Sequence, residues 1–335
     1  MNARPLRIGF VRLVDAAPII VAHEMGFARE EGLELSLEAA PNWSTLRDRL
    51  SFGQLDAAHM LAPVPVAGAL GLGGGGAWLQ ALSVLSVNGN VIGVSREVAR
   101  RMAQAGHGFD FSDAYAAGRA LIAAKGADLR IGVPFPFSMH AELVYYWLSV
   151  LGLPAPQSIQ IRTVPPALMK EAMEAGELDA FCVGEPWGSR SVEAGVASLL
   201  LPSSAIWSFA PEKVLAVRAD WTDTHRDTAE RLIRAVWRAG RWLAEPSSKM
   251  LTAELLSKKR YLDLPAELLD RALTGQFVIS PDGESRDTAG FVEFFAGGRG
   301  LSLAQSGGVD RAQAGAAHRP RPGHGGRGRA RHLPQ

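Results

Sequence analysis

A group of cationic and N–H-bearing residues in this chain suits the binding of a small anion. Lys213 opens an apolar, strand-like run and can supply one compensating positive charge. His140 follows the expected helix cap Ser138 by two residues, where the helix dipole favours anions. Asn88 and Gly89, within "VNGN", can donate N–H groups from a turn. Each also has a structural interpretation: a lysine at a strand start is usually solvated, a histidine at a helix start is usually a cap or surface residue, and Asn-Gly is primarily a turn signal.

Further aromatic, histidine and acidic residues are candidates for the same anion site or its surroundings. Trp43, at the start of "NWSTLRDRL", can donate its indole N–H and cover the face of an anion, whereas His59 is either a site residue or a satisfied core histidine. Glu185 and Trp187 follow the buried run "AFCVG", and strand tips in open α/β sheets are where ligands are held. Because a carboxylate repels an anion, we expect Glu185 to fix the strand tip or a partner, and Trp187 to pack between lobes at the cleft mouth.

The elements that must position these residues alternate between strand and helix patterns, twice. Three strands, "LRIGFVRL", "LELSLEAA" and "LDAAHMLAP", are separated by two helices, the first capped by Asp15. After residue 129 the order recurs with "LRIGVPFP", "IQIRTVPP" and "LDAFCVGEP", and both series contain Gly-x-Leu-Asp-Ala before the third strand. The sequence therefore predicts two similar α/β lobes with mixed, mostly parallel sheets and a ligand between their strand tips.

Two further strands are predicted to connect the lobes. "NVIGVSREV" leaves lobe one and "KVLAVRADW" leaves lobe two, and two crossings make a hinge. We therefore expect lobe one over 1–92 and 214–295, lobe two over 93–213, and a separate basic tail over 296–335.

Composition restricts the class of protein. The chain has 335 residues, of which 47% are hydrophobic and 21% charged, enough for one large or two medium domains. The tail holds seven Arg and one Asp, which leaves 28 basic and 33 acidic residues in 1–295, and this mildly acidic body argues against direct nucleic-acid binding. The single cysteine, Cys182, excludes an internal disulfide and is expected to be a packed thiol.

Enzyme, metal and membrane signals are weak. The sequence contains no Gly-x-Ser-x-Gly motif, "GLGGGG" lacks the Lys-Ser/Thr of a phosphate loop, and the histidines show no metal-ligand spacing, so we expect no enzyme, cofactor or metal. The longest uncharged run, 60–95, is broken by prolines and glycines, and "MNARPLRIGF" has no apolar leader. We therefore expect a cytoplasmic protein without a membrane span.

Several stretches together resemble the nitrate- and bicarbonate-binding (NrtA/CmpA-type) family of solute-binding proteins, which has the two-lobed periplasmic-binding-protein type II fold. They are "LDAAHMLAPVP", "LSVNGNVIGVS", "FPFSMHAELVYYWLSVLG", "VPPALMKEAMEAGELDAFCVGEPW" and "WSFAPEKVLAVRADW". The resemblance implies that Lys213, His140 and Asn88 contact nitrate or nitrite. It also implies a cleft position for Met60, where relatives carry a tryptophan whose place His59 or Trp43 takes here.

The expected location favours the cytoplasmic sensor branch, similar to NasS, in which the ligand-free protein sequesters a NasT-like RNA-binding antiterminator. Two alternatives remain. One is the substrate-binding component of a nitrate- or bicarbonate-type ABC transporter. The other, a pyrimidine-precursor synthase on the same fold, would need several cleft histidines and cysteines.

The composition changes abruptly after "FVEFF". The tail 296–335 has few apolar residues, and we expect either a disordered basic tail or the product of a reading-frame shift near residue 297. In both cases residues from about 300 onward are expected to lack packed structure.

Overall fold

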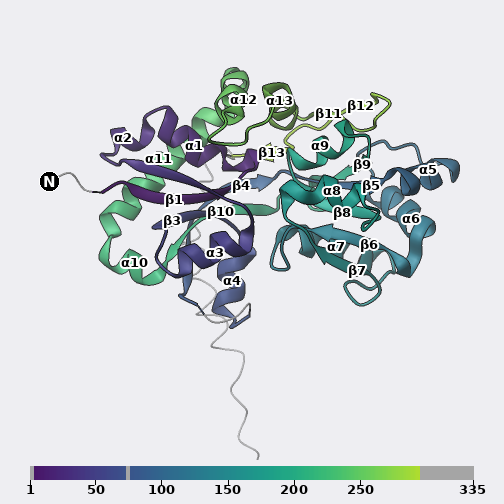
Figure 1. Ribbon diagram of the computed structural model, residues 1–335, viewed down its shortest axis with the longest axis horizontal. Helices are drawn as coiled ribbons and strands as arrows, with labels where there is room; N and C mark the ends of the chain where they lie inside the picture. The colour runs from purple at the N-terminus through teal and green to yellow at the C-terminus, as the bar shows by residue number, and fades with distance from the viewer. Residues whose placement is uncertain (1–3, 73–75, 295–335) are drawn as a thin grey trace, which may run out of the picture. The chain divides into compact units, whose positions relative to one another are not determined.

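Two mixed β-sheets organise the chain in the computed structural model, which describes residues 4–72 and 76–294. The first sheet has the strand order β13-β4-β10-β3-β1-β2 and the second has the order β7-β6-β8-β5-β9 (Figure 1). We call the first sheet with its helices lobe one, and the second sheet with its helices lobe two. The expectation for the tail 296–335 lies outside the described residues.

Lobe one takes its strands from both ends of the described chain. Its strands are β1 (Leu6–Val11), β2 (Leu35–Ala40), β3 (Ala57–Leu61), β4 (Leu79–Asn88), β10 (Pro211–Arg218) and β13 (Val292–Glu293). Its helices are α1 (Ala17–Glu24), α2 (Phe27–Glu30), α3 (Trp43–Ser51), α4 (Pro63–Ala69), α10 (Ala219–Thr224), α11 (Arg226–Ala244), α12 (Lys249–Ser257) and α13 (Ala266–Thr274), with 3₁₀ turns at Val14–Ala16 and Pro246–Ser248. A short hairpin joins β11 (Gln276–Val278) to β12 (Ser285–Asp287).

Lobe two is built from the middle of the chain. Its strands are β5 (Asn90–Ser95), β6 (Arg130–Val133), β7 (Gln160–Thr163), β8 (Ala180–Gly184) and β9 (Ala197–Pro202). Its helices are α5 (Arg96–Gln104), α6 (Ala114–Lys125), α7 (Met139–Val150), α8 (Met169–Glu174) and α9 (Trp187–Glu193), with 3₁₀ turns at Gly126–Asp128, Pro166–Leu168 and Ser203–Ala205.

The predicted mixed α/β fold is confirmed, and the structure shows which strands pair in parallel and which pair antiparallel. β1 pairs in parallel with β2 and β3, and β6 pairs in parallel with β7 and β8. The strands that arrive from the other lobe run antiparallel to their neighbours: β10 lies between β3 and β4, and β5 lies between β8 and β9. The parallel arrangement is therefore confined to the two βαβαβ units, because the crossing strands enter each sheet in the opposite direction.

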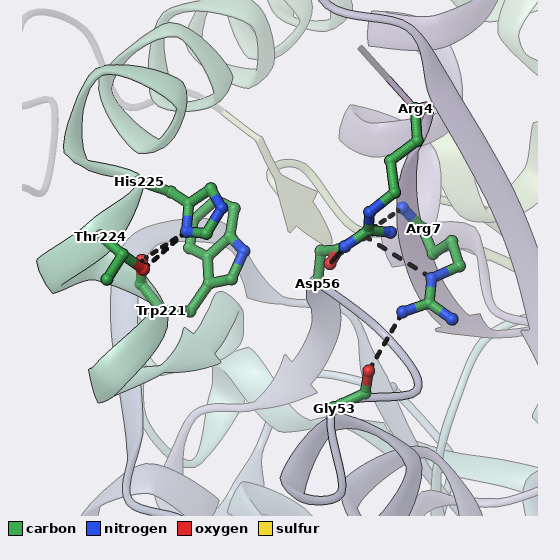
Figure 2. A network of polar contacts seen from close by, with 7 residues as sticks. All are labelled: Arg4, Arg7, Gly53, Asp56, Trp221, Thr224 and His225. Atoms are coloured by element: carbon green, nitrogen blue, oxygen red, sulfur yellow. Dashed lines mark hydrogen bonds and ion pairs between the residues drawn. The ribbon is translucent and has the colours of Figure 1, made fainter.

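The repeated sequence segments form equivalent contacts in the two lobes. The Asp56 carboxylate accepts the backbone N–H of Arg7 at 2.9 Å and pairs with the Arg4 guanidinium at 2.7 Å (Figure 2). The Asp179 carboxylate accepts the backbone N–H of Arg130, also at 2.9 Å, and pairs with its guanidinium. The Asp of each Gly-x-Leu-Asp-Ala segment thus fixes the start of the neighbouring central strand.

The crossing between lobes occurs at a tight Asn-Gly turn. Asn88 and Gly89 both have left-handed backbones, with φ of 60° and 97°, and they separate β4 from β5. The Asn88 side chain donates to the Ser208 carbonyl at 3.0 Å and accepts the Ala210 N–H at 3.1 Å, so it ties the first crossing to the second. The expected lobe boundaries at 92/93 and 213/214 fall inside β5 and β10, because each strand pairs along its whole length in the sheet it enters.

Two local expectations are corrected. The expected strand "NVIGVSREV" ends at Ser95, whose side chain caps α5 by accepting the Val98 N–H. The prolines of "LAPVP" predict a turn after β3, but the structure has the helix α4 there. This helix tolerates its prolines because Pro63 and Pro65 lie in the first turn, where backbone N–H groups have no helical partner. No helix among residues 4–72 and 76–294 is both long and apolar enough to cross a bilayer.

Candidate functional site

A buried group of charged and polar side chains surrounds Lys213 where residues of both lobes meet. We call Lys213, Asp15, Glu212, His59, His140 and Trp43 the Lys213 cluster. All six side chains are almost fully excluded from solvent. The structure therefore brings together four of the predicted site residues and adds two carboxylates.

The Lys213 ammonium lies between the two carboxylates. Its Nζ is 2.7 Å from Asp15 Oδ2 and 2.9 Å from Glu212 Oε1. Burial would lower the pKa of Lys213, but the two carboxylates raise it above its usual value, so this lysine is cationic. Its Nζ also lies 5.5 Å from the centre of the Trp43 ring, a cation–π contact. The expected solvated position for a lysine at a strand start does not apply here.

The Asp15 carboxylate is the second fixed charge. Burial would raise the pKa of Asp15, but Lys213 and His59 outweigh it and hold the pKa below its usual range. His59 Nε2 lies 2.9 Å from Asp15 Oδ1, and burial lowers the pKa of His59 despite this neighbour. The expected helix-capping role of Asp15 is wrong: it sits in the turn Val14–Ala16, and α1 begins at Ala17 without a side-chain cap.

Lobe two contributes the N-terminus of α7. Ser138 caps this helix, because its hydroxyl accepts the Ala141 N–H at 3.2 Å and donates to the Phe135 carbonyl at 2.6 Å. His140 lies in the first turn, and its Nδ1 is 3.2 Å from Glu212 Oε1. Burial and the Lys213 charge lower the pKa of His140 well below its usual value, so the imidazole is neutral. The Ser138 hydroxyl therefore donates its proton to the Phe135 carbonyl and not to His140.

Several buried hydrogen-bonding atoms in this region have no protein partner among the described residues. They are Trp43 Nε1, His59 Nδ1, Ser86 Oγ and His140 Nε2. Ser86 is paired with Lys213 across β4 and β10, which places it beside the lysine. Buried polar groups are normally satisfied, so a concentration of unsatisfied atoms around one charged group indicates the position of a polar ligand.

The other predicted site residues lie at the edges of this cluster. Asn88 uses its amide to join the two crossings, and the Gly89 carbonyl accepts the Glu185 N–H at 3.3 Å. Met60 lies opposite Val214 rather than Lys213 in the β3–β10 pairing and packs in the lobe-one core. Their predicted contacts with an anion stay predictions.

The segment after β8 joins the lobes. The Glu185 carbonyl accepts the Val14 N–H at 2.9 Å, and Trp187 Nε1 donates to the Arg12 carbonyl at 2.8 Å. The Glu185 side chain is buried and accepts the Ser189 N–H at 3.1 Å, and burial raises its pKa to about 7. Both residues thus hold lobe two against residues 12–14, beside Asp15.

Sequence reasoning missed Asp15 and Glu212. The side chains of adjacent strand residues normally point to opposite faces, so Glu212 was not expected to contact Lys213. The β4–β10 pairing shifts register between Pro211 and Lys213 and again after Lys213, and these irregularities bring Glu212 Oε1 to the ammonium. The only signal in the sequence was the dipeptide Glu-Lys itself.

Within the described ranges, no three His, Cys, Asp or Glu side chains are arranged to hold a metal ion. Cys182 is buried in β8, and burial raises the pKa of its thiol well above the usual value. The thiol is therefore not poised as a nucleophile.

The chain belongs to the NMT1-like family, whose model matches residues 1–257. It is 34% identical over 263 residues to the bicarbonate transport ATP-binding protein CmpC of Synechocystis sp. (strain ATCC 27184 / PCC 6803 / Kazusa), covering 77% of this chain and 38% of that protein. It is 31% identical over 274 residues to the nitrate/nitrite binding protein NrtA of the same organism, covering 79% and 59%. The chain thus spans less than two thirds of the length of these relatives.

Solved structures show the same fold. The periplasmic nitrate-binding protein NrtA from Synechocystis PCC 6803 superposes with a TM-score of 0.78 at 28% identity, over 88% of this chain and 76% of that chain. The alkanesulfonate-binding protein SsuA from Xanthomonas axonopodis pv. citri has a TM-score of 0.63 at 17% identity, over 94% of both chains, which supports the fold alone. The expected periplasmic-binding-protein fold and the NrtA/CmpA-type family are therefore confirmed.

Proposed function

We propose that this chain binds nitrate or nitrite at the Lys213 cluster, between its two lobes. The observation that carries this proposal is a buried cation surrounded by hydrogen-bond donors without protein partners. Nitrate is a planar monoanion with weak acceptors on three oxygens, so its site needs one positive charge and several N–H or O–H donors. Lys213 provides the charge, Trp43 and Ser86 provide donors, and His140 provides one when its Nε2 carries a proton.

The position of the cluster supports a hinged binding mechanism. Lys213, Asp15 and Trp43 come from lobe one, His140 comes from lobe two, and all are buried. Entry of an ion therefore requires the lobes to separate, and the Asn88–Gly89 turn and residues 203–210 are the two connections that must flex. The bound anion then links the two lobes.

Bicarbonate is the competing ligand, and one observation favours it. The ion carries a hydroxyl and needs an acceptor, and the buried carboxyl of Glu212 can supply one. The relatives include proteins named for bicarbonate transport as well as for nitrate import.

Isothermal calorimetry with nitrate, nitrite, bicarbonate and taurine tests the ligand class. We expect micromolar binding of nitrate or nitrite, about −8 kcal/mol. Heat with bicarbonate alone would reassign the ligand, and no heat with any of the four would refute the proposal.

We further propose that the protein acts in the cytoplasm as a sensor. In this proposal the ligand-free form holds an RNA-binding antiterminator of the NasT type, and closure on the anion releases it. The support is the resemblance to the NrtA/CmpA-type family, which the sensor branch shares with transport proteins. A transport role uses the same binding step, and the relatives named for bicarbonate transport and nitrate import support that role.

Co-purification with a tagged antiterminator, with and without nitrate, separates these roles. Release by nitrate is the result expected of a sensor. A complex that does not respond to nitrate, or no complex with the antiterminator, would contradict the sensor role.

A further inference from the structure

The Lys213 cluster has more negative than positive fixed charge. The positive charge of Lys213 and the negative charge of Asp15 cancel each other. Glu212 is a second carboxyl on the same ammonium, at 2.9 Å, and the Asn90 side chain also interacts with it. An anion that enters this enclosure therefore meets a cation that is already neutralised.

The Glu212–His140 pair can accept a proton. Burial raises the pKa of Glu212 above its usual value, although Lys213 opposes the shift. His140 is neutral and its Nδ1 lies 3.2 Å from Glu212 Oε1, so either group can hold a proton that the pair shares. A negative ion placed nearby stabilises the protonated form of both groups.

Other ionisable groups border this pair on several elements. Lys213 follows Glu212 on β10, Asp15 faces Lys213 from the turn after β1, His59 on β3 contacts Asp15, and the Cys182 thiol on β8 experiences the Glu212 charge. Lys213 stays charged and Asp15 stays ionised, because each stabilises the other. The Cys182 thiol stays protonated, since burial raises its pKa.

We propose that the anion is bound together with one proton, taken from solvent and held by the Glu212–His140 pair. This inference rests on the proposed anion-binding function. No covalent bond changes: the proton joins a carboxylate oxygen of Glu212 or a ring nitrogen of His140, and it leaves when the anion leaves. The neutral acid or the imidazolium then adds one more donor to the site. Anion affinity consequently falls as pH rises.

Calorimetry in buffers with different ionisation enthalpies measures the proton directly. With nitrate near pH 7, we expect the observed heat to change with the buffer by an amount equal to about one proton taken up per ion bound. As pH rises above neutral, the dissociation constant should increase, by up to about tenfold per pH unit. Binding with a buffer-independent heat and a constant affinity would overturn the proton coupling and leave the proposed function standing.

Two matched variants assign the proton. Glu212→Gln keeps the shape of the side chain and cannot ionise, so nitrate should bind without the carboxyl-linked proton uptake and with a flatter pH dependence. Glu185→Gln is the control, because Glu185 is also a buried carboxyl, with a pKa raised to about 7, but contacts the Ser189 N–H instead of Lys213. Glu185→Gln should retain the full uptake.

Full uptake in Glu212→Gln would overturn the assignment, and so would loss of uptake in Glu185→Gln. If Glu212→Gln does not fold, the wild type and Glu185→Gln still decide, since loss of uptake in Glu185→Gln contradicts the proposal. Absence of nitrate binding at every pH is a different result, and it refutes the proposed function itself.

Discussion

The two lobes are built on the same segments but carry different side chains at the ends of their strands. In each lobe a Leu-Arg-Ile-Gly strand lies beside the strand of the Gly-x-Leu-Asp-Ala segment, and the Asp accepts the N–H of the Arg. In lobe one this framework is surrounded by Asp15, His59 and Lys213. In lobe two the equivalent strand β8 ends at Gly184, and a helix N-terminus supplies His140.

The same framework therefore positions charged side chains in lobe one and a helix N-terminus in lobe two. The repeated segments fix backbone positions, whereas the side chains at and beyond the strand ends differ between the lobes. Gly184 illustrates this: a Cβ there would lie 3.0 Å from Leu13 Cδ2 and 3.8 Å from Asp15 Oδ2, so the glycine allows lobe two to approach the charged residues of lobe one. The variants below compare matched positions in the two lobes.

The largest effect is expected for the buried lysine of the cluster. Lys213→Met leaves Asp15 and Glu212 buried beside each other without a cation, which should cost about 3–5 kcal/mol of unfolding free energy. Anion affinity should fall by at least about 100-fold, because the site then holds two carboxyl groups and no lysine cation. Urea denaturation and calorimetry measure the two effects.

The matched control is a lysine in lobe two that also contacts a carboxylate. Lys125 Nζ lies 3.0 Å from Asp179 Oδ1, but Asp179 keeps Arg130 as a second partner. Lys125→Met should therefore cost less than about 1 kcal/mol. Equal losses for the two lysines would contradict the special position of Lys213.

The two buried carboxyls beside the lobe contact should respond to pH with opposite signs. The pKa of Glu185 is raised from 4.5 to about 7, so the folded state retains a proton that the unfolded state releases as pH rises. The unfolding free energy of the wild type therefore falls as pH rises from about 4.5 to about 7. Glu185→Gln lacks this loss, so between pH 4 and pH 8 its unfolding free energy should improve relative to wild type by up to about 3 kcal/mol. Urea denaturation at both pH values measures the difference.

Asp15 is the contrasting case, because its pKa is held below the usual range. Its contribution is present at neutral pH and is lost as pH falls through the acidic range, so Asp15→Asn should destabilise the protein at pH 7 and less at low pH. If the unfolding free energies of Glu185→Gln and wild type change with pH in the same way, the raised pKa of buried Glu185 is contradicted.

The two framework aspartates should be equivalent. Asp56→Ala and Asp179→Ala each leave a backbone N–H and a guanidinium without their acceptor, and each should cost about 1–3 kcal/mol. The exposed Asp220→Ala should stay within about 0.5 kcal/mol of wild type. A large difference between Asp56→Ala and Asp179→Ala would show that the repeat does not have the same role in both lobes.

The smallest difference is expected between the central glycines of the two repeats. A Cβ at Gly9 would lie 2.4 Å from Leu46 Cδ1 and 2.5 Å from Leu55 Cδ1, whereas at Gly132 the nearest atoms are Leu178 Cδ1 at 2.6 Å and Met169 Sδ at 2.9 Å. Since a thioether adapts more easily than a leucine, Gly9→Ala should cost about 2 kcal/mol and Gly132→Ala about 1 kcal/mol. Thermal unfolding resolves the two, and a larger loss for Gly132→Ala would contradict the packing argument.

Much of the framework was predictable from the sequence, and the charge balance of the site was not. Alternating strand and helix patterns and the repeated Gly-x-Leu-Asp-Ala segments identify the two lobes, because such local patterns determine which segments pair. Lys213 and His140 were recognisable as donors with the chemistry that an anion needs. Asp15 was not, since its contact with Lys213 joins residues far apart in the chain and depends on the packing of β1, β3 and β10. Glu212 depends on a register irregularity that no sequence pattern specifies.

The most direct test of the anion site is a nitrate titration followed by NMR of ¹⁵N-labelled histidine rings. The ring nitrogens of His140 and His59 should shift in a saturable manner with one shared dissociation constant, because both border the proposed ligand. Assignment comes from His140→Asn and His59→Asn, and the partly exposed His23 and His107 and the exposed His225 serve as internal controls. A titration in which the His140 and His59 signals do not move, or move only in step with the controls, would contradict an anion site at the Lys213 cluster.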